Sequence, residues 1–150
     1  MPASIYSNAA LMDHNNHPDY KYVLDDATHQ HDGINPSCGD EMTLYLKMDG
    51  DVIEEASFEG HGCAVSQASA DMMAGLIEGQ TAEEAERLSK LFIGMIQGKE
   101  LSEQDKEDLD EAAELESISH MPSRVKCAEL AWRTLTGILE DRDEESATTE

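Results

Sequence analysis

The chain has 150 residues, with 33 aspartates and glutamates against 10 lysines and arginines, which gives a formal net charge of −23. A chain of this length suits one domain that buries about two-thirds of its unfolded surface without staples. The acid excess repels phosphate backbones and anionic lipids, and no apolar run approaches the roughly 18 residues of a membrane span, so we expect no nucleic-acid partner and no membrane.

Two short elements are predicted before the first apolar strand. Residues 4–13 have helical spacing, with Ile5, Ala9 and Met12 on one apolar face. The polar stretch that follows is interrupted by Pro18, and its end is predicted to be an edge strand.

A β-hairpin is predicted next. Residues 41–48, EMTLYLKM, alternate in the manner of a half-buried strand. Asp49, Gly50 and Asp51 signal a tight turn in which the glycine supplies a positive φ, and residues 52–60 run back as the second strand. The side chains expected on the buried face are Leu44, Leu46, Met48, Val52, Ala56 and Phe58.

The periodicity then changes to that of helices. The stretch 63–79 has apolar residues at helical spacing, and Gly79 suits its C-terminal cap. Thr81 and Glu84 resemble a capping box that opens the next helix.

The acidic stretch 98–120 is poorly periodic, although Ser102 with Asp105 can start a short helix. Pro122 suits the first turn of the last helix. Its apolar residues step by three and four: Val125, Ala128, Trp132, Leu135 and Leu139.

Strands followed by helices predict the α+β class, with a small antiparallel sheet and helices packed on one face. We expect one domain over residues 1–140. The acidic tail 141–150 has nothing to bury and is expected to be disordered.

The three cysteines are candidates for one site. Cys38 precedes the hairpin and Cys63 follows it, and the two ends of a hairpin meet at one edge of the sheet. Cys63 also begins a helix, where free N–H groups favour a thiolate, and Cys127 begins the last helix. Together with Asp40, two residues after Cys38, they would complete a tetrahedral zinc site.

Spacing alone leaves open the alternative that these are three unrelated buried cysteines, because no two of them are closely spaced and buried cysteines are common in protein cores.

The chain begins without the basic and apolar regions of a secretory signal. An odd number of cysteines in an unexported chain predicts reduced thiols and a cytoplasmic location.

The motifs closely resemble the SufU branch of the IscU-like iron–sulfur cluster assembly proteins. They are NPSCGD, FEGHGCAVS and RVKCA, and the match runs from about Met12 to Trp132. The resemblance implies an IscU-like fold and a zinc ion on Cys38, Asp40, Cys63 and Cys127. It also implies a SufS-type cysteine desulfurase as partner, with downstream Suf scaffold proteins.

One departure separates this chain from IscU-type scaffolds, which carry a histidine immediately before the third cysteine. Here that position is Lys126, and a longer acidic insert separates the helices, as in the SufU branch. Both features favour a sulfur carrier over a scaffold. Arg124 and Lys126 are candidates for offsetting the negative charge of the site or contacting the partner, while ordinary solvated charge is an equally good account of Lys126.

The predicted function is a sulfur-relay protein that acts as a zinc-dependent sulfurtransferase and accepts persulfide sulfur on Cys38. Its loop position, beside glycine, lets Cys38 leave the metal, and we expect a ligand from the partner to replace it. The alternative is a scaffold that assembles a transient [2Fe–2S] cluster on the same cysteines, because thiolates bind either metal.

The histidines His14, His17, His29 and His31 are interpreted as surface residues.

Overall fold

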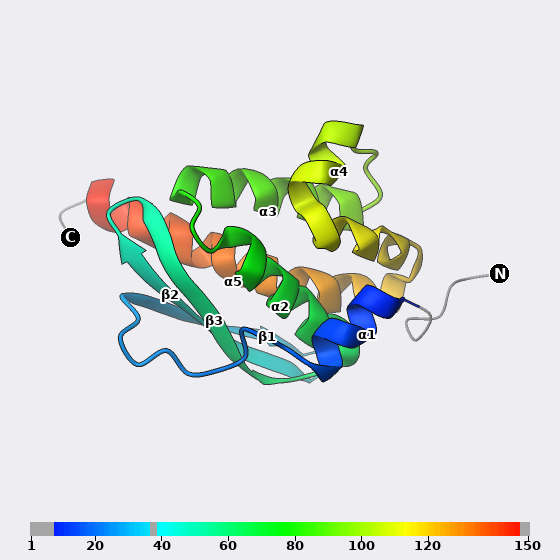
Figure 1. Ribbon diagram of the computed structural model, residues 1–150, viewed down its shortest axis with the longest axis horizontal. Helices are drawn as coiled ribbons and strands as arrows, with labels where there is room; N and C mark the ends of the chain where they lie inside the picture. The colour runs from blue at the N-terminus through cyan, green and yellow to red at the C-terminus, as the bar shows by residue number, and fades with distance from the viewer. Residues whose placement is uncertain (1–7, 37–38, 148–150) are drawn as a thin grey trace.

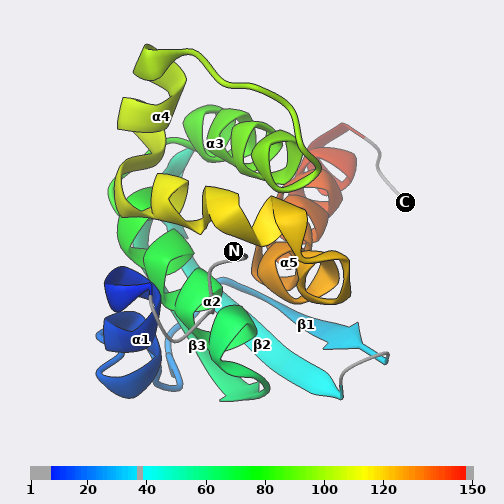
Figure 2. The same ribbon diagram turned by 90° about the vertical axis from the view of Figure 1, so that its right-hand side faces the viewer.

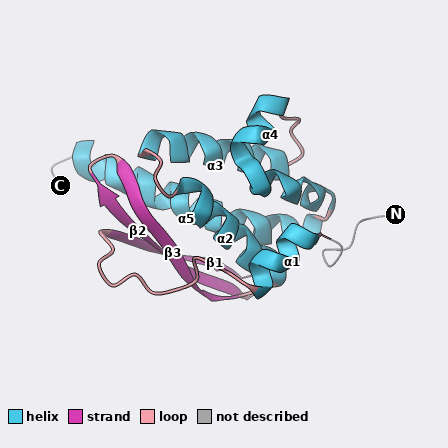
Figure 3. Cartoon of the chain, in the orientation of Figure 1, coloured by secondary structure: helices cyan, strands magenta, loops and turns pink. Residues whose placement is uncertain are grey.

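The computed structural model describes residues 8–36 and 39–147. A three-stranded antiparallel sheet in the order β1-β2-β3 is covered by helices on one face, which confirms the predicted α+β class (Figures 1 and 3). The strands are β1 His29–Asn35, β2 Asp40–Asp49 and β3 Val52–His61. The helices are α1 Ala9–Asn16, α2 Ala64–Ile77, α3 Ala82–Ile96, α4 Glu103–Leu109, the 3-10 helix η2 Asp110–His120, and α5 Pro122–Ala147.

The helices form two layers above the sheet (Figure 2). Helix α5 packs on β1 and β2, and α2 packs on β3, so these two helices lie directly on the strands. Helix α3 packs on the outer side of α5, and η2 contacts α2, α3 and α5. The core therefore continues from the sheet through α2 and α5 to the outer helices.

Trp132 lies at the centre of the helical layers and is fully buried. Its ring stacks on Phe92 of α3, with ring centroids 4.2 Å apart. Its indole N–H donates to the hydroxyl of Ser69 on α2 at 2.9 Å, and that hydroxyl donates to the Ala128 carbonyl at 2.7 Å. One polar link thus accompanies the apolar contact where α2, α3 and α5 meet, because a buried indole needs a hydrogen-bond partner.

The predicted hairpin is confirmed, with Gly50 at a φ of 61° in its turn. One face assignment is wrong. The register shifts between Lys47 and Met48, so Ile53 enters the core while Val52 stays 39% exposed. A bulge adds one residue to one strand and reverses the side-chain alternation beyond it, which a strict period of two cannot anticipate.

The acidic stretch before α5 is ordered into α4 and η2, and Ser102 caps α4 as predicted. Its buried apolar residues recur every third position: Leu109, Ala112, Leu115 and Ile118. A 3-10 helix has three residues per turn, so this spacing lays one continuous stripe on the core. The stretch looks poorly periodic only against the α-helical period.

Helix α1 differs from its prediction in position and in buried face. It begins after Asn8, whose side chain accepts a hydrogen bond from the Leu11 N–H, and residues 4–7 lie outside the described residues. Leu11 is the fully buried residue, whereas Ala9 is exposed. Contact with α2 selects this face.

The surface interpretation is wrong for His14, whose ring lies between Asp71 of α2, at 2.6 Å, and Glu111 of η2, at 3.1 Å. Burial lowers the pKa of His14, but the hydrogen bonds and charges of the two carboxylates outweigh this effect. The pKa of His14 is therefore raised above its ordinary value. His17 is exposed, and His29 and His31 are half-buried.

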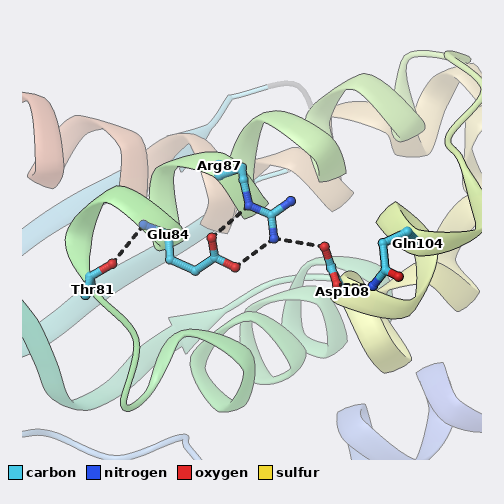
Figure 4. Close-up of polar contacts among 5 residues, drawn as sticks. All are labelled: Thr81, Glu84, Arg87, Gln104 and Asp108. Carbon is cyan, nitrogen blue, oxygen red and sulfur yellow. Dashed lines mark hydrogen bonds and ion pairs between the residues drawn. The ribbon is translucent and has the colours of Figure 1, made fainter.

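An ion pair joins α3 to α4 at the surface (Figure 4). The Arg87 guanidinium donates two hydrogen bonds to Glu84 and one to Asp108. Thr81 caps α3 by accepting from the Glu84 N–H, and Gln104 donates to Asp108. The Arg87 fork also holds the pKa of Glu84 below its usual value.

Helix α5 continues as helical backbone to Ala147. The disorder expected for residues 141–150 stays a prediction. Among the described residues, the helices are all too short or too polar to cross a membrane.

The Trp132 link predicts a measurable loss of stability. Ser69→Ala should lower the free energy of unfolding by about 1–3 kcal/mol, because the buried indole N–H then lacks an acceptor. Arg87→Met is the control, since it removes hydrogen bonds that are exposed and should cost less. Urea unfolding of both variants checks this, and a Ser69→Ala loss no larger than that of Arg87→Met would contradict it.

Candidate metal centre

Strand β2, helix α2 and helix α5 all begin at one end of the molecule, on the right-hand side of Figure 1 (also Figure 2). Asp40 is the first residue of β2, Cys63 is the N-cap of α2, and Cys127 lies in the second turn of α5. One carboxylate oxygen and the two Sγ atoms all lie within 4.8 Å of one another. Three candidate ligands that are far apart in sequence thus meet in space.

The strand ends position Asp40. In the register of β1 with β2, Asn35 is directly opposite Asp40, so the loop between them has only four residues. Gly39 lies in this loop at a φ of 72°, and its N–H donates to the Asn35 carbonyl at 2.9 Å. Cys38 belongs to the same loop but lies outside the described residues.

Asp40 is 1% exposed, and its carboxylate is held on both sides. Its Oδ1 accepts the Cys63 N–H at 2.9 Å, which fixes the start of α2 against the start of β2. Its Oδ2 faces the side-chain amide of Asn35 at 3.4 Å. Cys127 is fully buried, whereas Cys63 is half-buried, so the group opens towards solvent on the Cys63 side.

The buried carboxylate indicates that a cation belongs here. None of the ion pairs recorded among the described residues involves Asp40. A buried charge without a counter-charge is costly unless it is paired or binds a metal. Two sulfurs and one carboxylate oxygen form a set that suits Zn²⁺ and leaves one tetrahedral position for another ligand.

The glycines of the FEGHGC motif are needed for close approach. Gly60 has a φ of 132°, and a Cβ there would overlap the Glu41 carbonyl of β2. A Cβ on Gly62 would come within 2.5 Å of both Asp40 Oδ1 and Ser66 Oγ. The backbone before Cys63 therefore fits against the Asp40 carboxylate only without a side chain.

The two predicted basic residues lie at the start of α5, near Cys127. Arg124 is half-buried, and Lys126 is exposed. Lys126 lines a surface hollow of about 640 Å³ together with Asn35 and Pro36, so it borders the site. The roles of Arg124 and Lys126 stay predictions.

Asn35 is a site residue that the sequence analysis did not single out. Its side-chain nitrogen lies 3.4 Å from Asp40 Oδ2 and 3.7 Å from Cys127 Sγ. The NPSCGD motif contained the signal for this role. Its asparagine and aspartate lie on either side of a four-residue loop, which places Asn35 opposite Asp40 when the flanking strands pair. That signal becomes readable only when the strand register is known.

The family described as the NifU-like N terminal domain has a model that matches residues 5–128. The chain belongs to this family.

Two curated relatives match most of this NifU-like chain. It is 46% identical over 125 residues to the zinc-dependent sulfurtransferase SufU of Bacillus subtilis, and the aligned residues make up 83% of each chain. It is 42% identical over 131 residues to the iron–sulfur cluster assembly scaffold protein IscU of Thermotoga maritima, and the aligned residues make up 87% of this chain and 89% of the relative.

Solved structures agree with this family. A crystal structure from Fervidobacterium islandicum AW-1, described as an iron–sulfur cluster assembly scaffold protein for the SUF system, has a TM-score of 0.82 at 39% identity. It covers 87% of this chain and 94% of its own. The NifU-like N-terminal domain of Brucella abortus, at 19% identity and a TM-score of 0.81, shows the same fold.

Gly62 provides a test of the site that leaves every candidate ligand in place. Gly62→Ala should weaken zinc binding by about 10-fold or more, because the added methyl group displaces the Asp40 carboxylate. Gly94→Ala is the matched control, since a Cβ there meets only the flexible side chain of Lys99. Competition with a chromogenic chelator measures both affinities, and equal values for Gly62→Ala and the wild type would contradict the site.

Proposed function

We propose that this NifU-like protein is a zinc-dependent sulfurtransferase for iron–sulfur cluster assembly. It accepts persulfide sulfur on Cys38 from a SufS-type cysteine desulfurase. The observation that carries the proposal is the group of Asp40, Cys63 and Cys127, with ligand atoms within 4.8 Å of one another. The 46% identity to a relative named as a zinc-dependent sulfurtransferase supports it.

The residues that would hold the zinc are Asp40, Cys63 and Cys127, with Cys38 as the fourth ligand. Bound zinc would keep the cysteine sulfurs as thiolates at neutral pH. The chain itself holds two of these ligands rigidly. Cys127 is fully buried in α5, and the Cys63 backbone donates to Asp40 while its carbonyl accepts the Ser66 hydroxyl at 3.0 Å.

These constraints favour Cys38 as the sulfur acceptor, because it belongs to the short loop between β1 and β2 rather than to a helix. Its thiolate attacks the outer sulfur of the partner's persulfide. A new S–S bond forms on Cys38, the S–S bond of the partner breaks, and the partner's cysteine leaves as a thiolate. No external oxidant or reductant is consumed.

The same chemistry sets the proposed partners and compartment. A desulfurase must deliver the sulfur, and downstream Suf scaffold proteins must take it from Cys38. Acceptance requires Cys38 as a reduced thiolate, which supports the cytoplasm as the compartment.

A second candidate function is a scaffold that assembles a transient [2Fe–2S] cluster. It is favoured by the 42% identity to a relative named as an IscU scaffold and by thiolates that bind iron as well as zinc. Metal analysis of the isolated protein separates the two functions. Stoichiometric zinc supports the sulfurtransferase, and an oxygen-labile brown chromophore supports the scaffold.

The sulfurtransferase predicts that the intact chain stimulates a SufS-type desulfurase supplied with cysteine. Cys38→Ser should abolish stimulation and the transfer of labelled sulfur, since its hydroxyl cannot carry a persulfide. Ser119→Ala, on η2, is the control and should behave as the wild type. Normal labelling of the Cys38→Ser protein would refute the proposed acceptor.

A further inference from the structure

Asn35 touches two of the proposed ligands and is buried, at 5% exposure. We propose that Asn35 is a positioning residue, whose side-chain amide holds Asp40 and Cys127 at the spacing that a metal ion requires. This inference rests on the proposed zinc site and deepens it, because it assigns a role to a residue that is not itself a ligand.

The geometry that supports this role comes from one nitrogen atom. Asn35 Nδ2 lies 3.4 Å from Asp40 Oδ2 and 3.7 Å from Cys127 Sγ. A primary amide has two N–H groups on that atom, so it can donate one to each ligand. The sulfur distance is within the longer range of N–H···S bonds, and the oxygen distance is a long hydrogen bond. The amide therefore bridges a ligand of β2 and a ligand of α5.

The scaffold holds Asn35 in this position from three directions. Asn35 ends β1 opposite Asp40, and its carbonyl accepts the Gly39 N–H. Its backbone is therefore fixed both by the strand pairing and by a hydrogen bond from the loop. Two residues earlier, β1 passes so close to α5 that a Cβ on Gly33 would overlap the Thr134 hydroxyl. That close approach brings the end of β1 to Cys127.

An amide suits this position because it donates hydrogen bonds without carrying charge. The carboxylate and thiolate ligands of a zinc site carry excess negative charge, which N–H donors reduce. A lysine or arginine at this position would reduce it as well, but its positive charge would repel the ion. The N–H···S bond also draws charge from the Cys127 sulfur, which makes that cysteine a fixed ligand and a weaker nucleophile.

Two substitutions separate donation from packing. Asn35→Ala removes the donor and the volume, whereas Asn35→Leu removes the donor and keeps a similar shape. Both should weaken zinc binding by about 10- to 100-fold in chelator competition. In the cobalt-substituted proteins, both should shift the sulfur-to-metal charge-transfer band, because the electron density on the Cys127 sulfur changes.

Thr136→Val is the control, since it removes a half-buried hydroxyl from the same helix, where it donates to the Trp132 carbonyl. It should leave the zinc affinity and the cobalt band unchanged. Thermal unfolding of the metal-free proteins identifies any loss of folding.

Wild-type affinity or an unshifted cobalt band in Asn35→Leu would overturn the positioning role. Recovery by Asn35→Leu of what Asn35→Ala loses would assign Asn35 to packing alone and would overturn it too. Either result leaves the zinc site standing. Failure of the wild type to bind zinc would instead refute the proposed function.

Discussion

The hydrogen bond from the Cys63 N–H to the buried Asp40 carboxylate is the interaction on which the site depends. It joins the first residue of β2 to the residue that caps α2, although 23 positions separate them in sequence. Asp40 is 1% exposed, and burying its carboxylate is costly unless hydrogen bonds and a cation compensate the lost hydration. The chain supplies the hydrogen bonds, and the neighbouring sulfurs supply the remaining ligands for a cation.

The rest of the fold keeps this junction closed. Helix α5 lies on β1 and carries Cys127 to the same end of the sheet, and the stacking of Trp132 on Phe92 anchors α5 against α3. Gly33 and Gly62 have no side chain at the points where backbone must approach α5 and Asp40. A metal ligand, a sheet edge and two helices are therefore positioned by the same few close contacts.

Much of this arrangement could be predicted from the sequence because its signals are local. The hairpin follows from alternation and Gly50, α3 and α4 follow from their capping residues, and α5 follows from Pro122 and its apolar stripe. The meeting of Cys63 and Asp40 follows from hairpin geometry, since its two ends must coincide.

Most of the features that the sequence did not predict depend on contacts between distant elements. Ile53 replaces Val52 in the core because a bulge shifts the register. The stripe of η2 has a period of three rather than 3.6. The half-buried ring of His14 lies between carboxylates of α2 and η2, and Asn35 reaches Cys127 only because β1 lies against α5. The contacts of Ile53, His14 and Asn35 cannot be read from a single local window. The stripe of η2 is local, but it is found only when a period of three is tested.

The central claim is that three sulfurs and one carboxylate oxygen surround a single zinc ion. X-ray absorption at the zinc edge of the isolated protein tests it most directly. The account predicts a first shell with three sulfur neighbours at about 2.3 Å and one oxygen neighbour at about 2.0–2.2 Å. A shell of oxygen and nitrogen alone, or a shell unchanged by Asp40→Ala and Cys127→Ser, would contradict it.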